Sequence, residues 1–190
     1  MGLLALFRRK PHERAGFTLY TAAVGAARDP ALFGELGVPD TLDGRFDVIN
    51  LYVGLLVRRL RADPDARGAA LAQALFDAMF ADMDMNLREM GVSDLRVGRR
   101  VKDMWEAFHG RAVAYEAALD AGDAEALALS FARNVWRGVA PGAVGEGDTL
   151  VAGPPARRLA DLAVAQAQHL AGQQIAALLR GEVDFLPVPA

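Results

Sequence analysis

Cysteine is absent from the 190 residues, and strand-forming sequence is scarce. The missing thiols exclude disulfides, thiolate nucleophiles and the common cysteine-based zinc motifs. No alternating run of Val, Ile and Thr occurs, so the sequence offers little to a β-sheet. Alanine, a strong helix former, supplies much of the 53% hydrophobic fraction. We therefore expect an all-α protein made of closely packed helices.

Nucleotide-binding and hydrolase motifs are also missing. The sequence has no Walker A loop, no dinucleotide-binding glycine motif, no nucleophile elbow and no H-E-x-x-H helix. His12, His109 and His169 lie far apart, and none has a second histidine three or four positions away. Each histidine is therefore expected at the surface or at a rim rather than on a metal. We expect no catalytic residue, no metal site and no cofactor.

Long hydrophobic runs and a net positive charge are lacking as well. The most apolar run, Val48 to Val57, is far shorter than the roughly 20 residues of a membrane-spanning helix. The net charge of −3 provides no basic field for nucleic acid, so no nucleic-acid partner is expected. Residues 1–11 combine a short apolar segment with Arg8, Arg9 and Lys10. This pattern predicts either a flexible, frayed terminus or contact with an anionic membrane surface.

Helical periodicity and glycine- or proline-rich breaks organise the rest of the chain. We expect a single-domain bundle of about six to seven helices, with the helical domain over residues 12–138. A glycine- and proline-rich stretch at 139–155 predicts a linker. An amphipathic helix is expected at 156–181, followed by an irregular tail at 182–190. Because the middle of that helix is poor in large apolar side chains, it is expected to pack on the outside of the bundle or on a partner.

The strongest prediction is a central antiparallel helical hairpin between Leu75 and Leu119. Apolar side chains recur at helical spacing on both sides of Gly91, which suits a left-handed helix C-terminus, and Ser93 or Asp94 can cap the next helix. So short a connection forces the helices to run antiparallel and to share their apolar faces. The stripe on the second helix contains Val97, Val101, Met104, Trp105, Phe108, Ala112, Tyr115 and Leu119.

Charged side chains border the two apolar stripes and leave two interpretations open. One helix carries carboxylates and the other arginines, so the helices can be cross-linked by an interhelical ladder of ion pairs. Alternatively, the charged margins form a surface that docks a partner. A metal site at Asp82 and Asp84 is disfavoured, because side chains two positions apart diverge on a helix. The candidate partner-binding residues are Asp77, Asp82, Asp84, Met85, Arg88, Glu89, Arg99, Lys102 and Arg111.

Four segments, in this order, resemble the ubiquinol–cytochrome c chaperone family: GVPDTLDGRF (37–46), LFDAMFADMD (75–84), LREMGVSDLRVGRRVKDM (87–104) and FHGRAVAY (108–115). The similarity covers about Tyr20 to Leu119, with a weaker match as far as Trp136. The C-terminal third of the chain is not covered. On these motifs the chain is identified as a bacterial member of the family.

The resemblance implies an all-helical chaperone for the assembly of respiratory complex III, which binds newly made cytochrome b until haem insertion and assembly proceed. It also implies a cytoplasmic protein that lies peripherally on the inner membrane. The mitochondrial relatives associate with a small partner protein and with the ribosome. Neither partner is assumed for this chain, which has no visible basic extension or transit peptide. Positive loops of a membrane client favour acidic partner surfaces, so the expected docking groups are Asp77, Asp82, Asp84 and Glu89.

Two other functions remain compatible with the sequence. The first is a helical carrier or enzyme that handles haem or quinone in an internal cavity, which would turn His109 inward. The second is a scaffold subunit whose last helix pairs with another subunit. A non-enzymatic assembly chaperone is the function that we expect.

Overall fold

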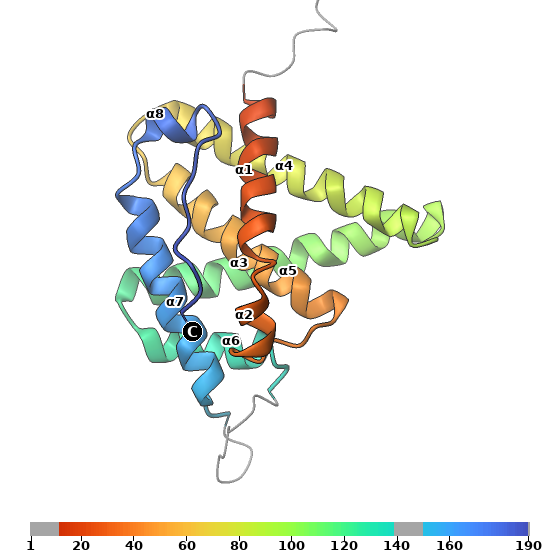
Figure 1. Cartoon of the computed structure of the whole chain (residues 1–190). Helices are drawn as coiled ribbons and strands as arrows, with labels where there is room; N and C mark the ends of the chain where they lie inside the picture. Colours follow the sequence, from red (N-terminus) through yellow and green to blue (C-terminus); the bar gives the residue numbers. More distant parts are fainter. Residues whose placement is uncertain (1–11, 139–149, 190) are drawn as a thin grey trace, which may run out of the picture.

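Two ranges of the chain, residues 12–138 and 150–189, are described by a computed structural model (Figure 1). Within them the chain forms eight α-helices and no strand, which confirms the prediction of an all-α bundle in a single domain. The count exceeds the predicted range of about six to seven, because a short helix follows the last long one. Residues 1–11, with the predicted membrane contact, and 139–149, the larger part of the predicted linker, lie outside the described ranges.

The helices begin and end at residues that suit those positions. Asp29, Thr41, Asp65 and Asp123 each cap a helix by accepting a hydrogen bond from a backbone N–H of its first turn. After the fourth helix, Gly91 adopts the predicted left-handed conformation, with a φ angle of 80°. The helices are α1 (Glu13–Ala26), α2 (Pro30–Gly34), α3 (Leu42–Arg61), α4 (Ala66–Glu89), α5 (Asp94–Ala121), α6 (Ala124–Asn134), α7 (Pro154–Ala171) and α8 (Ile175–Leu178).

The centre of the core is α3, which contacts α1, α4, α5 and α7. Its apolar side chains are covered on nearly all sides: Val48, Val53, Leu56 and Leu60 are each 0% exposed. Figure 1 shows α1 crossing over this helix. The most apolar run of the sequence is thus the middle of a helical bundle. Throughout the described ranges, no helix combines the length and the hydrophobicity that a membrane crossing requires.

The last long helix, α7, contributes one face to the core. It packs on α6 and α3, and Leu159, Ala160, Ala163 and Leu170 are at most 1% exposed. Its opposite face is exposed at Arg157, Arg158 and Asp161, so α7 packs on the bundle through one face. Its small side chains allow close approach between helices. The helix also ends at Ala171 rather than near residue 181.

The C-terminal tail runs back along α7 without regular structure (Figure 1). Gln166 is 1% exposed, and its side-chain amide exchanges two hydrogen bonds, of 2.7 and 3.0 Å, with the backbone of Leu186. The ring of Phe185 meets Tyr52 of α3 edge-on, with 5.2 Å between the ring centroids. These contacts fix the tail on the bundle, because a buried amide satisfies both of its polar atoms there.

The predicted hairpin is present, but its two helices diverge. Figure 1 shows α4 and α5 meeting at one end and separating toward the bundle, where both contact α3. The two helices therefore share their apolar faces from the turn as far as Phe76 and Phe108, whose ring centroids are 5.4 Å apart, and separate beyond that contact. Of the stripe predicted on α5, Val97, Phe108 and Tyr115 are buried, whereas Trp105 is 45% exposed. The prediction that Trp105 faces the core is wrong, since it is the neighbouring Phe108 that packs on Phe76 and Phe80 of α4.

Candidate functional site: a groove between α3, α4 and α5

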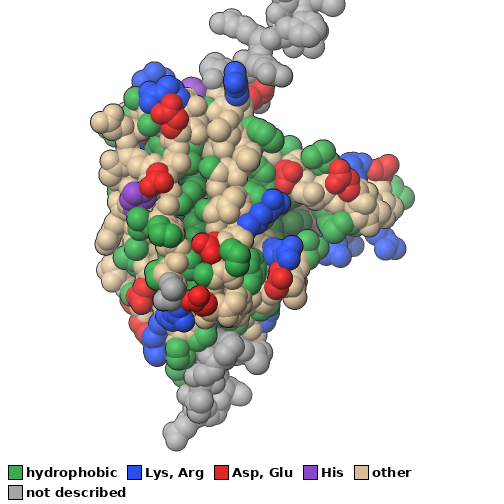
Figure 2. Space-filling view, in the orientation of Figure 1, with side chains coloured by type: hydrophobic (Ala, Val, Ile, Leu, Met, Phe, Trp, Pro, Cys, Tyr) green, Lys and Arg blue, Asp and Glu red, His purple; other side chains and the backbone are tan. Residues whose placement is uncertain are grey.

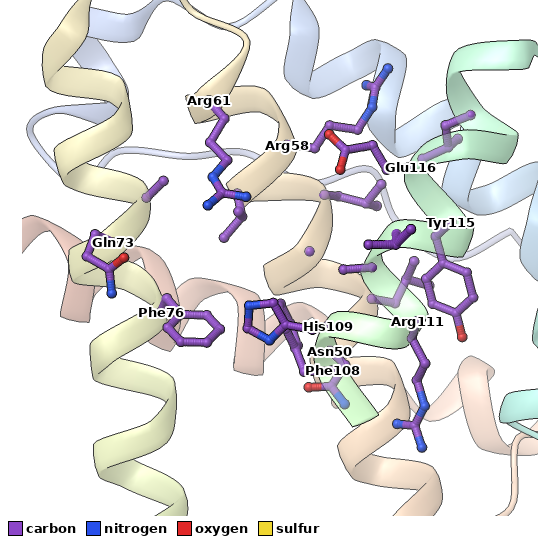
Figure 3. Close-up of a pocket in the computed structure, with 18 of the residues that line it drawn as sticks. Asn50, Arg58, Arg61, Gln73, Phe76, Phe108, His109, Arg111, Tyr115 and Glu116 are labelled. Atoms are coloured by element: carbon purple, nitrogen blue, oxygen red, sulfur yellow. The ribbon is translucent and has the colours of Figure 1, made fainter. Parts of the chain in front are cut away.

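A groove lies where α4 and α5 separate, with α3 as its floor (Figure 3). It has a volume of about 140 Å³ and opens to solvent beside the exposed side chains of Arg61, Gln73 and His109. Its inner surface is mainly apolar and comes from all three helices: Leu51, Leu55, Ala72, Phe76, Phe108 and Ala112. Such a surface suits apolar side chains of another molecule.

Gly54 keeps the floor of the groove open. It lies in the interior of α3, where a glycine costs about 0.5–1 kcal/mol relative to alanine. A Cβ atom added to Gly54 would meet no other atom within 4 Å, so tight packing does not require a glycine. Neither packing nor helix propensity explains a glycine at this position. We therefore attribute the glycine to the groove, because a larger side chain here would fill its empty space.

Asn50 places an unpartnered amide in the groove wall. Its side chain is 4% exposed, and neither Oδ1 nor Nδ2 has a hydrogen-bond partner in the described structure. Leaving a buried polar group without a partner costs about 1–3 kcal/mol. The amide offers one acceptor and two donors, which matches the C=O and N–H of a peptide group. A polar ligand atom reaching this depth would recover that cost.

An aromatic cluster joins α4 to α5 at the rim of the groove. The ring of Phe76 lies 5.4 Å from those of both Phe108 and His109, and Trp105 stacks on His109 at 4.0 Å (centroid distances; Figure 3 labels the first three). The Nδ1 atom of His109 is 3.0 Å from the Trp105 carbonyl oxygen, to which it can donate. His109 thus lies at a rim, as predicted, and does not project into an enclosed cavity.

A buried ion-pair network beneath the groove holds α3, α5 and the chain after α6 together. Asp47 is 3% exposed and accepts from Arg111 of α5 and, at 2.8 Å, from Arg137. Burial raises the pKa of Asp47 to about 6, although both arginines favour its charged form. The guanidinium of Arg111 also lies 6.0 Å from the ring centroid of Phe46. Arg111, a predicted partner-binding residue, is therefore engaged within the fold.

Asp47 should titrate near pH 6, about two units above a carboxyl of the unfolded chain. Between about pH 4 and pH 6 the folded protein then binds a proton that the unfolded chain does not, so this group's contribution to stability decreases as the pH rises. The ¹³C chemical shift of the Asp47 carboxyl measures the pKa. The unfolding free energies of wild type and of Asp47→Asn are then compared at two pH values. The difference, wild type minus variant, should be larger at pH 4.5 than at pH 7.5. Titration near pH 4 or below would mean that the arginines outweigh burial.

The predicted docking carboxylates differ in how free they are to meet a partner. Asp82 is half-buried and accepts hydrogen bonds from the Tyr20 hydroxyl at 2.7 Å and from Asn86 at 2.9 Å. Burial and this hydrogen bond raise the pKa of Tyr20. Asp82 therefore joins α1 to α4. Asp77 and Glu89 are exposed, and neither forms an ion pair within the described residues.

The cations near the hairpin turn do not form the predicted ladder. Arg88 lies between Asp84, at 2.6 Å, and Asp94, and its contact with Asp94 is the one ion pair between α4 and α5 in the described ranges. Lys102 pairs within α5, with Glu106 at 3.6 Å. The ladder is wrong because the two helices diverge beyond the turn. The remaining candidates, Met85 and Arg99, are exposed on the hairpin.

The groove residues other than Arg111 are absent from the predicted partner-binding set. The available signal was in α3, whose apolar run is interrupted only by Asn50 and Gly54. Both residues line the groove. No periodicity argument could place α4 and α5 on either side of them. In the part of the chain that is described, no group of three or more His, Asp or Glu side chains could hold a metal ion.

The helical bundle presents a groove with an apolar surface bordered by charged side chains, an arrangement typical of proteins that bind other molecules. The family model described as "Ubiquinol-cytochrome C chaperone" matches residues 34–185. The chain belongs to the ubiquinol-cytochrome C chaperone family, which confirms the resemblance found in its motifs. The match extends through α7 into the tail, beyond the segments that carried that resemblance.

Two relatives illustrate the similarity. The chain is 24% identical over 121 residues to "Ubiquinol-cytochrome-c reductase complex assembly factor 1" of Xenopus laevis, an alignment that covers 64% of this chain. The chain spans 60% of the length of that relative. It also superimposes on the crystal structure of the Cbp3 homolog from Brucella abortus with a TM-score of 0.79 and 33% identity, over 98% of each chain. The bacterial structure thus shares the helical fold.

Proposed function

We propose that this chain is a non-enzymatic assembly factor of ubiquinol–cytochrome c reductase, and that its groove binds newly synthesised cytochrome b. Membership of the chaperone family supports an assembly role. The name of the Xenopus relative describes assembly of the same complex. A subunit that awaits its partners exposes apolar helices, and an apolar groove on a chaperone can cover part of that surface.

The observation that carries the proposal is the buried, unpartnered amide of Asn50 inside an apolar groove. Both polar atoms of the amide are buried, so a client segment that displaces the side chains covering them would let the amide pair with its main-chain peptide group. Such pairing would hold the segment largely independently of its side-chain sequence. The open floor at Gly54 leaves room for a side chain of the same segment. The groove therefore combines an apolar surface with a buried polar anchor and with charged side chains at its margin, as an unfolded or partly folded client requires.

Carboxylates on α4 support a second contact with the client. Asp77 and Glu89 are exposed, and Asp84 is partly exposed beside Arg88. The cytoplasmic loops of membrane proteins are rich in Lys and Arg, so acidic side chains would speed the first encounter. Asp82 is less suited, because Tyr20 and Asn86 occupy its carboxylate. This arrangement supports action at the cytoplasmic face of the inner membrane.

Photo-cross-linking during synthesis of cytochrome b tests the proposal. A photoreactive amino acid in place of Gln73, an exposed residue at the groove, should form an adduct with cytochrome b that mass spectrometry identifies. Gln168, an exposed glutamine of α7 outside the groove, is the matched control and should form none. Adducts at Gln168 but not at Gln73 would place the client elsewhere. Absence of cytochrome b from both adducts would reject it as the client.

The two other functions have less support from the geometry. Small-molecule sites usually enclose about 300–1,000 Å³. The groove has about 140 Å³, which suits part of a polypeptide better than a haem or a quinone. A scaffold role through the last helix would need α7 to be available, yet α7 is packed into the core.

A further inference from the structure

The hairpin tip, residues 88–102, projects from the body of the protein (Figures 1 and 2). Leu87, directly before the tip, and Val97 within it form a small separate core: they are 6% and 0% exposed, yet neither belongs to the main core cluster. The turn is closed by a 3.0 Å hydrogen bond from the Val92 N–H to the Leu87 carbonyl. The tip is therefore an ordered projection that can present side chains at a distance from the groove.

Large aliphatic side chains at this tip face solvent. Leu95, in the first turn of α5, is 95% exposed, and Met90, at the end of α4, is 53% exposed. No aromatic residue occurs between positions 88 and 102. Covering these exposed aliphatic side chains with another apolar phase would remove them from water and lower the free energy.

Three arginines without acidic partners lie in the same tip as Leu95 and Met90. Arg96, Arg99 and Arg100 are exposed, and none forms an ion pair within residues 12–138 and 150–189. Arg99 and Arg100 follow Arg96 by three and four residues, so the three arginines share one face of α5. Arg99 also follows Leu95 by four residues and is therefore its neighbour on the helix surface. The tip contains five cations and two carboxylates, in a chain whose net charge is −3. The positive charge is thus concentrated where the aliphatic side chains are exposed.

From this combination we infer that the hairpin tip docks on an anionic lipid bilayer. Leu95 and Met90 enter the boundary between headgroups and acyl chains, and the three arginines contact lipid phosphates. A single-stranded nucleic acid fits less well, because the tip has no aromatic side chain on which a base could stack. Docking through the tip uses none of the groove residues, so it does not depend on the identity of the client.

Vesicle flotation of the full-length chain tests the inference. The chain should bind phosphatidylcholine vesicles that contain phosphatidylglycerol at least about tenfold more tightly than vesicles of phosphatidylcholine alone. Replacing Arg96, Arg99 and Arg100 by glutamine should reduce this binding by about tenfold or more. The matched control replaces Arg14, Arg28 and Arg133, which are exposed arginines outside the tip, and should bind as wild type does. Circular dichroism melts verify that both variants are folded.

Insertion of the tip is measured independently of charge. Because the chain has no native cysteine, Leu95→Cys carries a single environment-sensitive fluorophore, and Leu42→Cys, at a residue 63% exposed on α3, is its control. Anionic vesicles should shift the emission of the first label to the blue and leave the second unchanged. Equal binding of the two arginine variants, or no shift at position 95, would overturn the inference. So would binding to RNA or to an acidic protein with no binding to vesicles.

Discussion

Replacing Gly54 by leucine should abolish capture of cytochrome b and leave the fold intact. The new side chain would rise from the floor of α3 into a groove of about 140 Å³ and occupy the space proposed for the client. Since an added Cβ meets nothing within 4 Å, the new side chain leaves the helix into open space. Leucine also favours the helix by about 0.5–1 kcal/mol relative to glycine. We expect at least about a tenfold loss of affinity, with an unfolding free energy equal to or above that of wild type.

Gly110 provides a matched control for this experiment. It also lies within a helix, has open space at its Cβ position, and is exposed on α5 outside the groove. Gly110→Leu should therefore gain similar helix stability and keep client binding. Affinity is measured by pull-down of newly synthesised cytochrome b, and stability by urea unfolding. If Gly54→Leu binds as wild type does, or if both variants lose binding equally, the groove is not the client site.

Substituting Arg111 by alanine should lower the unfolding free energy by about 3 kcal/mol, because it leaves a buried carboxylate with one partner instead of two. Asp47 is 3% exposed, and without Arg111 it retains only Arg137, whose side chain is 46% exposed. The cation–π contact with Phe46 is lost as well. Urea unfolding at pH 7.5 measures the change. At pH 5 the loss should shrink, because the carboxyl is then neutral in the folded protein.

Two further variants identify the cause of this destabilisation. Arg99→Ala removes an exposed arginine of the same helix and should change the stability by less than about 0.5 kcal/mol. In the Arg111→Ala background, Asp47→Asn removes the buried charge and should restore part of the loss, a coupling that a double-mutant cycle measures. A loss below about 1 kcal/mol for Arg111→Ala, or no coupling with Asp47, would show that the ion pair does not hold α5 to α3.

The residues that define the site show which of its features the sequence can predict and which depend on the tertiary structure. Asn50 and Gly54 are visible in the sequence as interruptions of an apolar run, but the sequence does not say that α4 and α5 separate in front of them. Trp105 shows the same limit, since it fits the apolar stripe of α5 and yet is 45% exposed. Periodicity identifies which side chains can be buried, and the partner helix determines which of them are.

The sequence by itself determined the helices, because spacing, caps and glycines act within one turn of the chain. The turn at Gly91 could be predicted on this basis, whereas the membership of a chaperone family was predicted from the resemblance of four sequence segments to that family. Only the tertiary structure decided the angle between α4 and α5, the burial of α7, and the pairing of Asp47 with Arg111 and Arg137. These features depend on how several helices fill one volume together, and packing between distant segments leaves no periodic trace in the sequence.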